Sequence, residues 1–237
     1  MRVGNGTIAP GRGSSGFTSG FTLTELLVTF SAGLLLLILL VQQFQQARRA
    51  TRINPLQCQE NLRLIGFALS EFSMDHADRY PWEVAANEGG SKDQVGSGQA
   101  APHFRALTRH IRNTRVLRCP LDPYRMREMS MDAIQDTGIS YFINISAAPA
   151  NRSAVLLGDR TVSTSPDLTT GELEVKSSSK LQWVKLSSEA PGHMKASAPE
   201  SAGNVYLGSA SMIETSTLQL RHLLRPIGSG AHLWLLP

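Results

Sequence analysis

The feature that most constrains this chain is a long, uninterrupted apolar run near its N-terminus. From Phe21 the sequence reads FTLTELLVTFSAGLLLLILLVQQFQQA, without proline and with Glu25 as the only charged residue before Arg48. At about 1.5 Å of rise per residue, a helix over residues 23–44 is about 33 Å long, enough to cross a hydrocarbon core of about 30 Å. The sequence therefore predicts a transmembrane helix over 23–44.

The segment before this run, residues 1–20, is rich in glycine and serine, has two arginines and lacks acidic residues. A secretory signal peptide fits poorly, because it needs an apolar stretch of only about 7–15 residues followed by a small-residue cleavage site. Here the apolar stretch is longer, and QQFQQARRA follows it. An uncleaved signal anchor remains an alternative at this point.

Glu25 is the most informative residue of the run. An ionised side chain well inside a membrane helix costs about 2.5–3.5 kcal/mol on insertion scales, and less near the helix end. A carboxylate in such a place is expected to be functional and to need a partner. We find no partner for it within the helix sequence, which points to another molecule or to a new N-terminus.

The residues from Gly20 to Val28, GFTLTELLV, resemble the processing site of type IV prepilins and type II secretion pseudopilins. The resemblance implies that a prepilin peptidase cleaves after Gly20 and that the new terminal residue, Phe21, is N-methylated. It also implies that Glu25, fifth in the mature chain, pairs with the terminal ammonium of a neighbouring subunit. The similar Gly16-Phe17-Thr18 does not satisfy this register, because cleavage after Gly16 would place Phe21 fifth.

Beyond the membrane, an apolar stripe predicts that the helix continues and packs against a globular head. The stripe repeats at alternating steps of four and three residues, which is the spacing of one helical face; its members are Cys58, Leu62, Ile65, Leu69, Phe72 and His76. Helix formation is expected to stop before Tyr80-Pro81-Trp82, because the residue before a proline disfavours helical geometry. We therefore expect a leader at 1–20, a helix at 21–80 and a head at 81–237.

The head shows short runs typical of β-strands, separated by loops rich in Gly, Ser and Pro at 86–100 and 187–202. The predicted strands are 116–118, 138–145, 154–157, 181–186 and 204–207, with 211–214 as a hairpin partner and 217–225 as a short final helix. The closing LWLLP has no pattern that we can interpret. The predicted fold class is α+β, with a long N-terminal hydrophobic helix packed on a small antiparallel sheet.

Several patches of the chain beyond the membrane resemble a pseudopilin-like group of planctomycete and verrucomicrobial bacteria. The matching segments are CQENLRLIG at 58–66, DHADRYPW at 75–82, VLRCPLD at 116–122, SYFIN at 140–144, LGDR at 157–160, His193, and GNVYL at 203–207. The Asp-Gly turn with which that group usually closes is replaced here by Gly208-Ser209-Ala210.

The two cysteines, Cys58 and Cys119, are far apart in sequence and form no CxxC pair, which disfavours a zinc or redox motif. An exported protein would bridge them, whereas a cytosolic one would keep two buried thiols. Since we place both beyond the membrane, we expect a disulfide, with two separately buried thiols as the alternative.

Charge and motifs narrow the remaining function classes. The formal charge of +4 falls to +2 once Arg2 and Arg12 leave with the leader, and no nucleic-acid-binding pattern organises the other basic residues. The sequence has no HExxH, GxSxG, P-loop or strand-linked GxGxxG. We expect no enzyme activity, no cofactor, no metal centre and no nucleic-acid partner. An alternative to the absence of a metal is a calcium site using Asp75, Asp122 and Asp159.

The resemblance implies a structural subunit of a type II secretion or type IV pilus-type apparatus. Its expected partners are a prepilin peptidase, other pilin-like subunits and the inner membrane. Its expected place is a single pass through that membrane, with the head in the periplasm or outside. The alternative is a membrane-tethered extracytoplasmic binding module that uses the prepilin export route.

Overall fold

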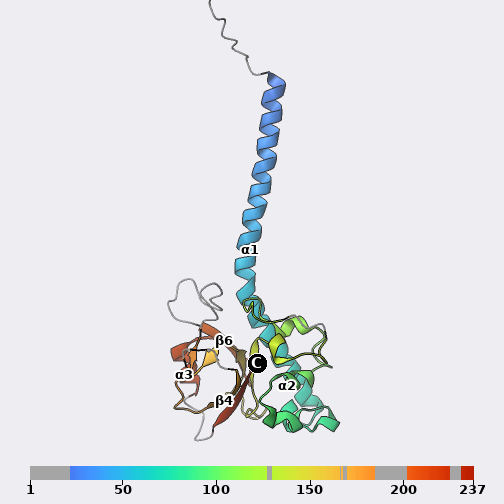
Figure 1. Cartoon of the computed structure of the whole chain (residues 1–237), viewed down its shortest axis with the longest axis vertical. Coiled ribbons are helices and arrows are strands. Elements are labelled where there is room, and N and C mark those ends of the chain that lie inside the picture. The colour runs from blue at the N-terminus through green and yellow to red at the C-terminus, as the bar shows by residue number, and fades with distance from the viewer. Residues whose placement is uncertain (1–21, 127–129, 166, 168–169, 185–201, 225–230) are drawn as a thin grey trace, which may run out of the picture. The chain divides into compact units, whose positions relative to one another are not determined.

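The computed structural model describes residues 22–126, 130–165, 167, 170–184, 202–224 and 231–237, without the side chains of residues 43–55. The chain divides into two compact units, Met1–Arg49 and Ala50–Pro237 (Figure 1). The fold is α+β.

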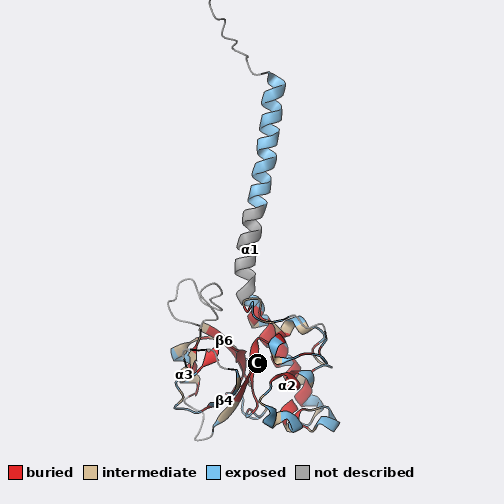
Figure 2. Ribbon diagram, in the orientation of Figure 1, coloured by how far each residue is buried: buried red, intermediate tan, exposed pale blue. Residues whose placement is uncertain are grey.

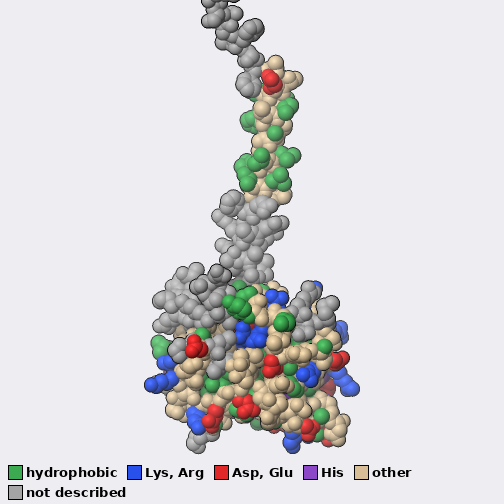
Figure 3. Space-filling view, viewed as in Figure 1, with side chains coloured by type: hydrophobic (Ala, Val, Ile, Leu, Met, Phe, Trp, Pro, Cys, Tyr) green, Lys and Arg blue, Asp and Glu red, His purple; other side chains and the backbone are tan. Residues whose placement is uncertain are grey.

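The first unit contains the N-terminal part of helix α1, which runs in all from Leu23 to Asp75. Within α1, Leu23–Gln42 is long and apolar enough to cross a membrane, with a mean hydropathy of 2.3 and none of its residues buried. Figure 2 shows this part exposed throughout, and Figure 3 shows hydrophobic side chains around it. The predicted span of 23–44 thus agrees closely with the apolar part of the helix.

Helix α1 ends at Asp75, five residues before the predicted end of the helix at residue 80. The cause is local, because Ala77 and Asp78 adopt left-handed backbone angles, with φ of 54° and 55°. The Asp78 amide turns back and donates to the Ser73 carbonyl oxygen at 2.9 Å, which satisfies a terminal carbonyl of the helix. The helix is therefore ended by the left-handed residues Ala77 and Asp78 and not by the Tyr80-Pro81 pair.

A six-stranded antiparallel sheet forms the centre of the second unit, in the order β4-β8-β1-β2-β6-β7. Its strands are β1 (Tyr141–Asn144), β2 (Val155–Asp159), β4 (Gly171–Val175), β6 (Ala202–Leu207), β7 (Met212–Ser216) and β8 (His232–Leu236). Two short strands, β3 (Val162–Ser163) and β5 (Gln182–Trp183), pair separately.

Both faces of this sheet are covered, so successive strand residues alternate between two apolar cores (Figures 1 and 2). Tyr141 and Ile143 face a core that includes the C-terminal part of α1. Phe142 and Trp234 stack at 4.3 Å in the other core, which lies under α3 (Thr217–Leu224). Strands buried on both faces read as continuous apolar runs.

The α1 side of the sheet is completed by short helical turns. They are η1 (Pro81–Glu83), η2 (Ala86–Glu88), η3 (Lys92–Ser97), α2 (Ala101–Arg105), η4 (Thr114–Leu117) and η5 (Asp136–Gly138). The predicted loop at 86–100 thus contains η2 and η3.

The strand prediction at 116–118 is wrong, because those residues belong to η4 and the residue after it. The Asn113 side chain accepts a hydrogen bond from the Arg115 amide at 3.0 Å and so starts a helical turn. The predicted strand at 181–186 is reduced to β5, and residues 185 and 186 lie outside the described residues. The other strand predictions overlap β1, β2, β6 and β7, and the final helix corresponds to α3.

Candidate functional site

Glu25 lies in the first turn of α1, where its carboxylate has a local partner. Its Oε2 accepts hydrogen bonds from the Thr22 amide at 3.0 Å and the Thr22 hydroxyl at 2.9 Å. In return the Glu25 amide donates to Thr22 Oγ1 at 3.3 Å. This is a capping box, which satisfies amide groups that the start of a helix leaves without partners.

The expectation that the helix offers Glu25 no partner was therefore wrong. The residues Thr22-Leu23-Thr24-Glu25 carry the Thr-x-x-Glu signature of a capping box, so this partner could have been found from the sequence. Gly20 and Phe21, the predicted cleavage and methylation residues, lie outside the described residues.

Cys58 and Cys119 form a disulfide in the structure, with their Cα atoms 5.1 Å apart. Cys58 comes from the buried face of α1 and is fully buried, while Cys119 follows η4 and is 3% exposed. The bridge ties the part of α1 that belongs to the second unit to the segment that follows η4. Cys119 is delivered by the end of a helical turn and not, as expected, by a core strand.

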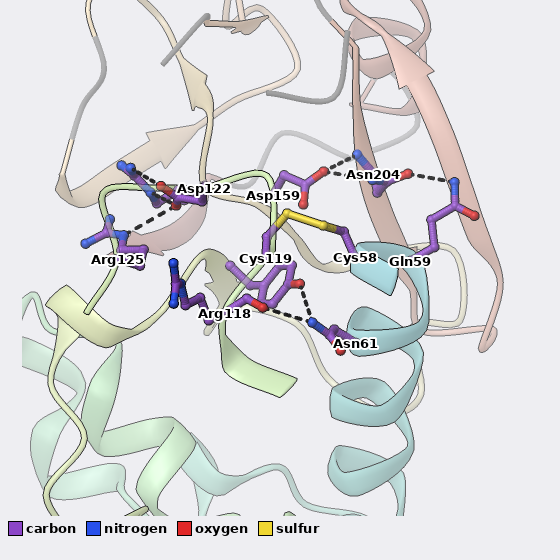
Figure 4. Close-up of a disulfide and its surroundings, with 11 residues drawn as sticks. Cys58, Gln59, Asn61, Arg118, Cys119, Asp122, Arg125, Asp159 and Asn204 are labelled. Carbon is purple, nitrogen blue, oxygen red and sulfur yellow. Dashed lines mark hydrogen bonds and ion pairs between the residues drawn. A yellow bond between two sulfur atoms is a disulfide. The ribbon is translucent and has the colours of Figure 1, made fainter. Parts of the chain in front are cut away.

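Two amide side chains of α1 reinforce this attachment next to the bridge (Figure 4). The Asn61 side chain donates to the Arg118 carbonyl oxygen at 3.0 Å and to the Tyr141 hydroxyl at 3.2 Å. Gln59 donates to the Asn204 side-chain oxygen at 3.1 Å, which connects α1 to strand β6. Burial raises the pKa of Tyr141 well above its usual value, so its hydroxyl stays protonated.

The carboxylates of the head are engaged in structural contacts. Asp159 Oδ2 accepts from the Asn204 amide at 2.7 Å and from the Asn204 side chain at 3.0 Å. Asp122 receives two hydrogen bonds from Arg160, at 2.6 and 3.0 Å, in a buried bidentate pair. Arg125 lies 3.6 Å from Asp122, and burial lowers the pKa of Arg125 to about 10. Paired in this way, buried charges are tolerated.

These contacts do not bring the three aspartates of the calcium alternative together. Asp122 binds Arg160, Asp159 binds Asn204, and Asp75 is on the surface of α1 near His110. Across the described residues, no group of three His, Cys, Asp or Glu side chains is arranged to hold a metal ion.

Comparison with known proteins adds no relative. No protein-family model matches the chain, and no curated protein and no solved structure matches it either.

Proposed function

We propose that this chain is a pilin-like subunit of the pseudopilin type, processed by a prepilin peptidase and anchored in the inner membrane by Leu23–Gln42. The observation that carries the proposal is the register of Gly20, Phe21 and Glu25 at the start of that apolar helix. We expect such a helix to be released from its leader at the Gly20–Phe21 bond and then to pack among copies of itself. Its single carboxylate, Glu25, is the fifth residue after Gly20.

Two features of the second unit support export of the head. The Cys58–Cys119 disulfide is stable in an oxidising compartment such as the periplasm, and rare in the bacterial cytosol. The buried stripe on α1 makes the same helix part of the core of the head. Such an arrangement suits a subunit whose helix carries both the membrane anchor and the foundation of an exported domain.

In the assembled state, the Glu25 carboxylate is proposed to pair with the Phe21 ammonium of a neighbouring subunit. A carboxylate at the start of α1 is already favoured by the helix dipole and by the Thr22 cap. A second, cationic partner would neutralise the charge that otherwise makes its place in lipid costly.

The alternative, a membrane-tethered extracytoplasmic binding module, is favoured by one observation. Because the Thr22 cap already accommodates the Glu25 carboxylate, the start of the helix is complete without a neighbouring subunit. Filament incorporation separates the two functions. Immunogold labelling of sheared filaments should detect a pilin-like subunit, whereas a tethered module stays entirely with the membrane fraction.

The cleavage step is tested by co-expressing the full chain with a prepilin peptidase. The wild-type chain should lose residues 1–20, Gly20→Ala should be processed more slowly, and Gly20→Val should stay intact. Gly16→Val is the matched control, because it alters the similar Gly-Phe-Thr without touching the proposed register. Normal processing of Gly20→Val, or a block by Gly16→Val, would show that the register is wrong.

A further inference from the structure

The part of α1 that belongs to the second unit has an exposed apolar face in addition to its buried one. Leu64 is 45% exposed, Phe67 59% and Met74 70%. They alternate along the helix with the buried stripe from Cys58 to Phe72 and lie on the side that the head leaves uncovered. Large apolar side chains exposed together on a soluble domain mark an interaction surface.

Leu64 and Phe67 form one wall of a groove of about 500 Å³. Residues 109–113 and Val116 form the other wall, where Ile111 adds a further apolar side chain. A groove of this volume is large enough to receive a few inserted side chains. The apolar part of the groove can therefore bind apolar side chains such as those beside it.

The wall opposite α1 is basic. Arg109 and Arg112 line the groove, and Arg115 is exposed in the same segment. The sequence has no acidic residue between Asp93 and Asp122. Within the part of the chain that the structure describes, none of these three arginines forms an ion pair with the described acidic residues.

The α1 wall continues into two carboxylates. Glu71 and Asp75 follow Phe67 at steps of four, so the three residues share one side of the helix. Their side chains are 38% and 66% exposed, and within the described residues their only ion-pair contacts are to His110, at 3.7 and 3.8 Å. Both distances exceed that of a hydrogen bond, which leaves the carboxylate oxygens open to a stronger cationic partner.

We propose that this surface, made of Leu64, Phe67, Glu71, Asp75, Arg109 and Arg112 and called here the α1 groove surface, binds the same surface of a second copy of the chain. A two-fold axis would place Phe67 of each copy in the groove of the other. It would also set Arg109 and Arg112 of one copy against Glu71 and Asp75 of its partner. One patch carries the apolar wedge, its receptor and both signs of charge, which is what an isologous interface requires.

This contact goes beyond the proposed function and does not depend on it. It uses only residues of the second unit, and it requires neither cleavage after Gly20 nor the Glu25 carboxylate. A chain that is never processed should therefore still form it, so the two proposals can fail separately.

Charge reversal gives a self-consistent test in full-length chains carrying two different tags, purified together in detergent. Arg109→Glu/Arg112→Glu should weaken pairing about tenfold or more, and Glu71→Arg/Asp75→Arg should do the same, because each homodimer then faces like charges. A mixture of the two variants should pair within about threefold of wild type, since opposite charges again meet at both contacts. Lys176→Glu/Lys180→Glu is the matched control, a double reversal on exposed residues that do not line the groove.

Site-specific cross-linking distinguishes pairing through this surface from association through the apolar helix of the first unit. Phe67→benzoylphenylalanine is irradiated in a mixture of isotopically light and heavy chains, and the cross-linked peptides are identified by mass spectrometry. Mixed light–heavy peptides joining residue 67 to the 109–116 segment are the expected result. The proposal would be overturned by cross-links that form only within one chain, to detergent or to another protein. It would also be overturned if the charge reversals had no effect or if mixing the two variants did not restore pairing.

Discussion

Thr22 and Glu25 bind each other reciprocally at the first turn of α1, each through its side chain and its backbone amide. Thr22 caps the Glu25 amide, and Glu25 caps the Thr22 amide. The carboxylate thus has a structural role within its own chain, in addition to the inter-subunit role proposed for it. The two roles make different demands, because capping needs only an acceptor oxygen and pairing with an ammonium needs a negative charge.

The first prediction separates these roles by substitution. Glu25→Gln keeps an acceptor for the Thr22 amide but removes the charge, and Glu25→Val removes both. Both variants should insert into the membrane at least as well as wild type, since the costly charge is gone, and both should fail to assemble. Thr22→Val is the control, since it weakens the cap and keeps the charge, and it should still assemble. Assembly is measured as the protein recovered in sheared filaments; filaments of Glu25→Gln would contradict the role of the charge.

The second prediction concerns the disulfide. Reducing the bridge, or replacing both cysteines by serine, should lower the free energy of unfolding by about 4 kcal/mol in the chain-entropy model. The reason is that the bridge joins residues 61 positions apart and so restricts a long loop of the unfolded chain. Urea unfolding of the full chain in detergent, with and without reductant, measures this. The Cys58→Ser/Cys119→Ser chain should be insensitive to reductant. Equal stability of the reduced and oxidised wild-type chains would show that the bridge does not stabilise the fold.

The third prediction is a loss of stability in mild acid, caused by His103. This side chain is fully buried, its Nδ1 lies 2.7 Å from the Ser91 hydroxyl oxygen, and burial lowers its pKa to about 4. In the unfolded chain the pKa of His103 is about 6.5, so His103 becomes protonated there at a higher pH than in the folded chain. The free energy of unfolding therefore falls as the pH drops from 6.5 towards 4. The loss from this residue reaches roughly 3 kcal/mol.

The check is the free energy of unfolding measured at several pH values for wild type and for His103→Gln. The variant should lose most of the decline between pH 6.5 and 4. Burial also lowers the pKa of His232, which leaves a smaller residual slope of the same sign. An unchanged slope in His103→Gln would show that another group causes the acid sensitivity.

The fourth prediction concerns the close approach of α1 to β6. A Cβ at Gly66 would collide with the ring of Tyr206. Gly66→Ala should therefore destabilise the head by about 1–3 kcal/mol through overpacking, although alanine favours a helix by about 1 kcal/mol over glycine. Gly66→Ala combined with Tyr206→Leu should recover part of that loss. A stabilised Gly66→Ala chain, seen in urea unfolding, would mean that the helix and strand are less closely packed.

The buried face of α1 and most of the strands were predictable from the sequence, whereas strand β8 was not. The stripe follows helical spacing, and its members from Cys58 to Phe72 are at most 1% exposed, whereas its last member, His76, lies past the end of α1 and is half-buried. Strand β8, by contrast, comes from LWLLP and its neighbours, which lie between two other strands and two cores. A strand buried on both sides shows no alternation, so its period cannot identify it; β1 and β2, which are also buried on both faces, were predicted from short runs of strand-favouring residues between turns.

The candidate site shows the same contrast. The cysteine pairing followed from the compartment and from there being two cysteines. The position of Cys119 did not, since the turn η4 depends on the Asn113 side chain and on packing across the chain. Asn61 and Gln59 were not singled out, because their partners, Tyr141 and Asn204, are distant in sequence and come close only in the folded head.

The identity of the N-terminal residue of the membrane-bound protein tests the central proposal most directly. The full chain is produced in a host with a prepilin peptidase, extracted from the membrane, and measured by intact mass and N-terminal sequencing. We expect a chain that begins at Phe21 and carries one methyl group on its terminal amine. A chain that retains residues 1–20, or one that begins at Phe17, would contradict it.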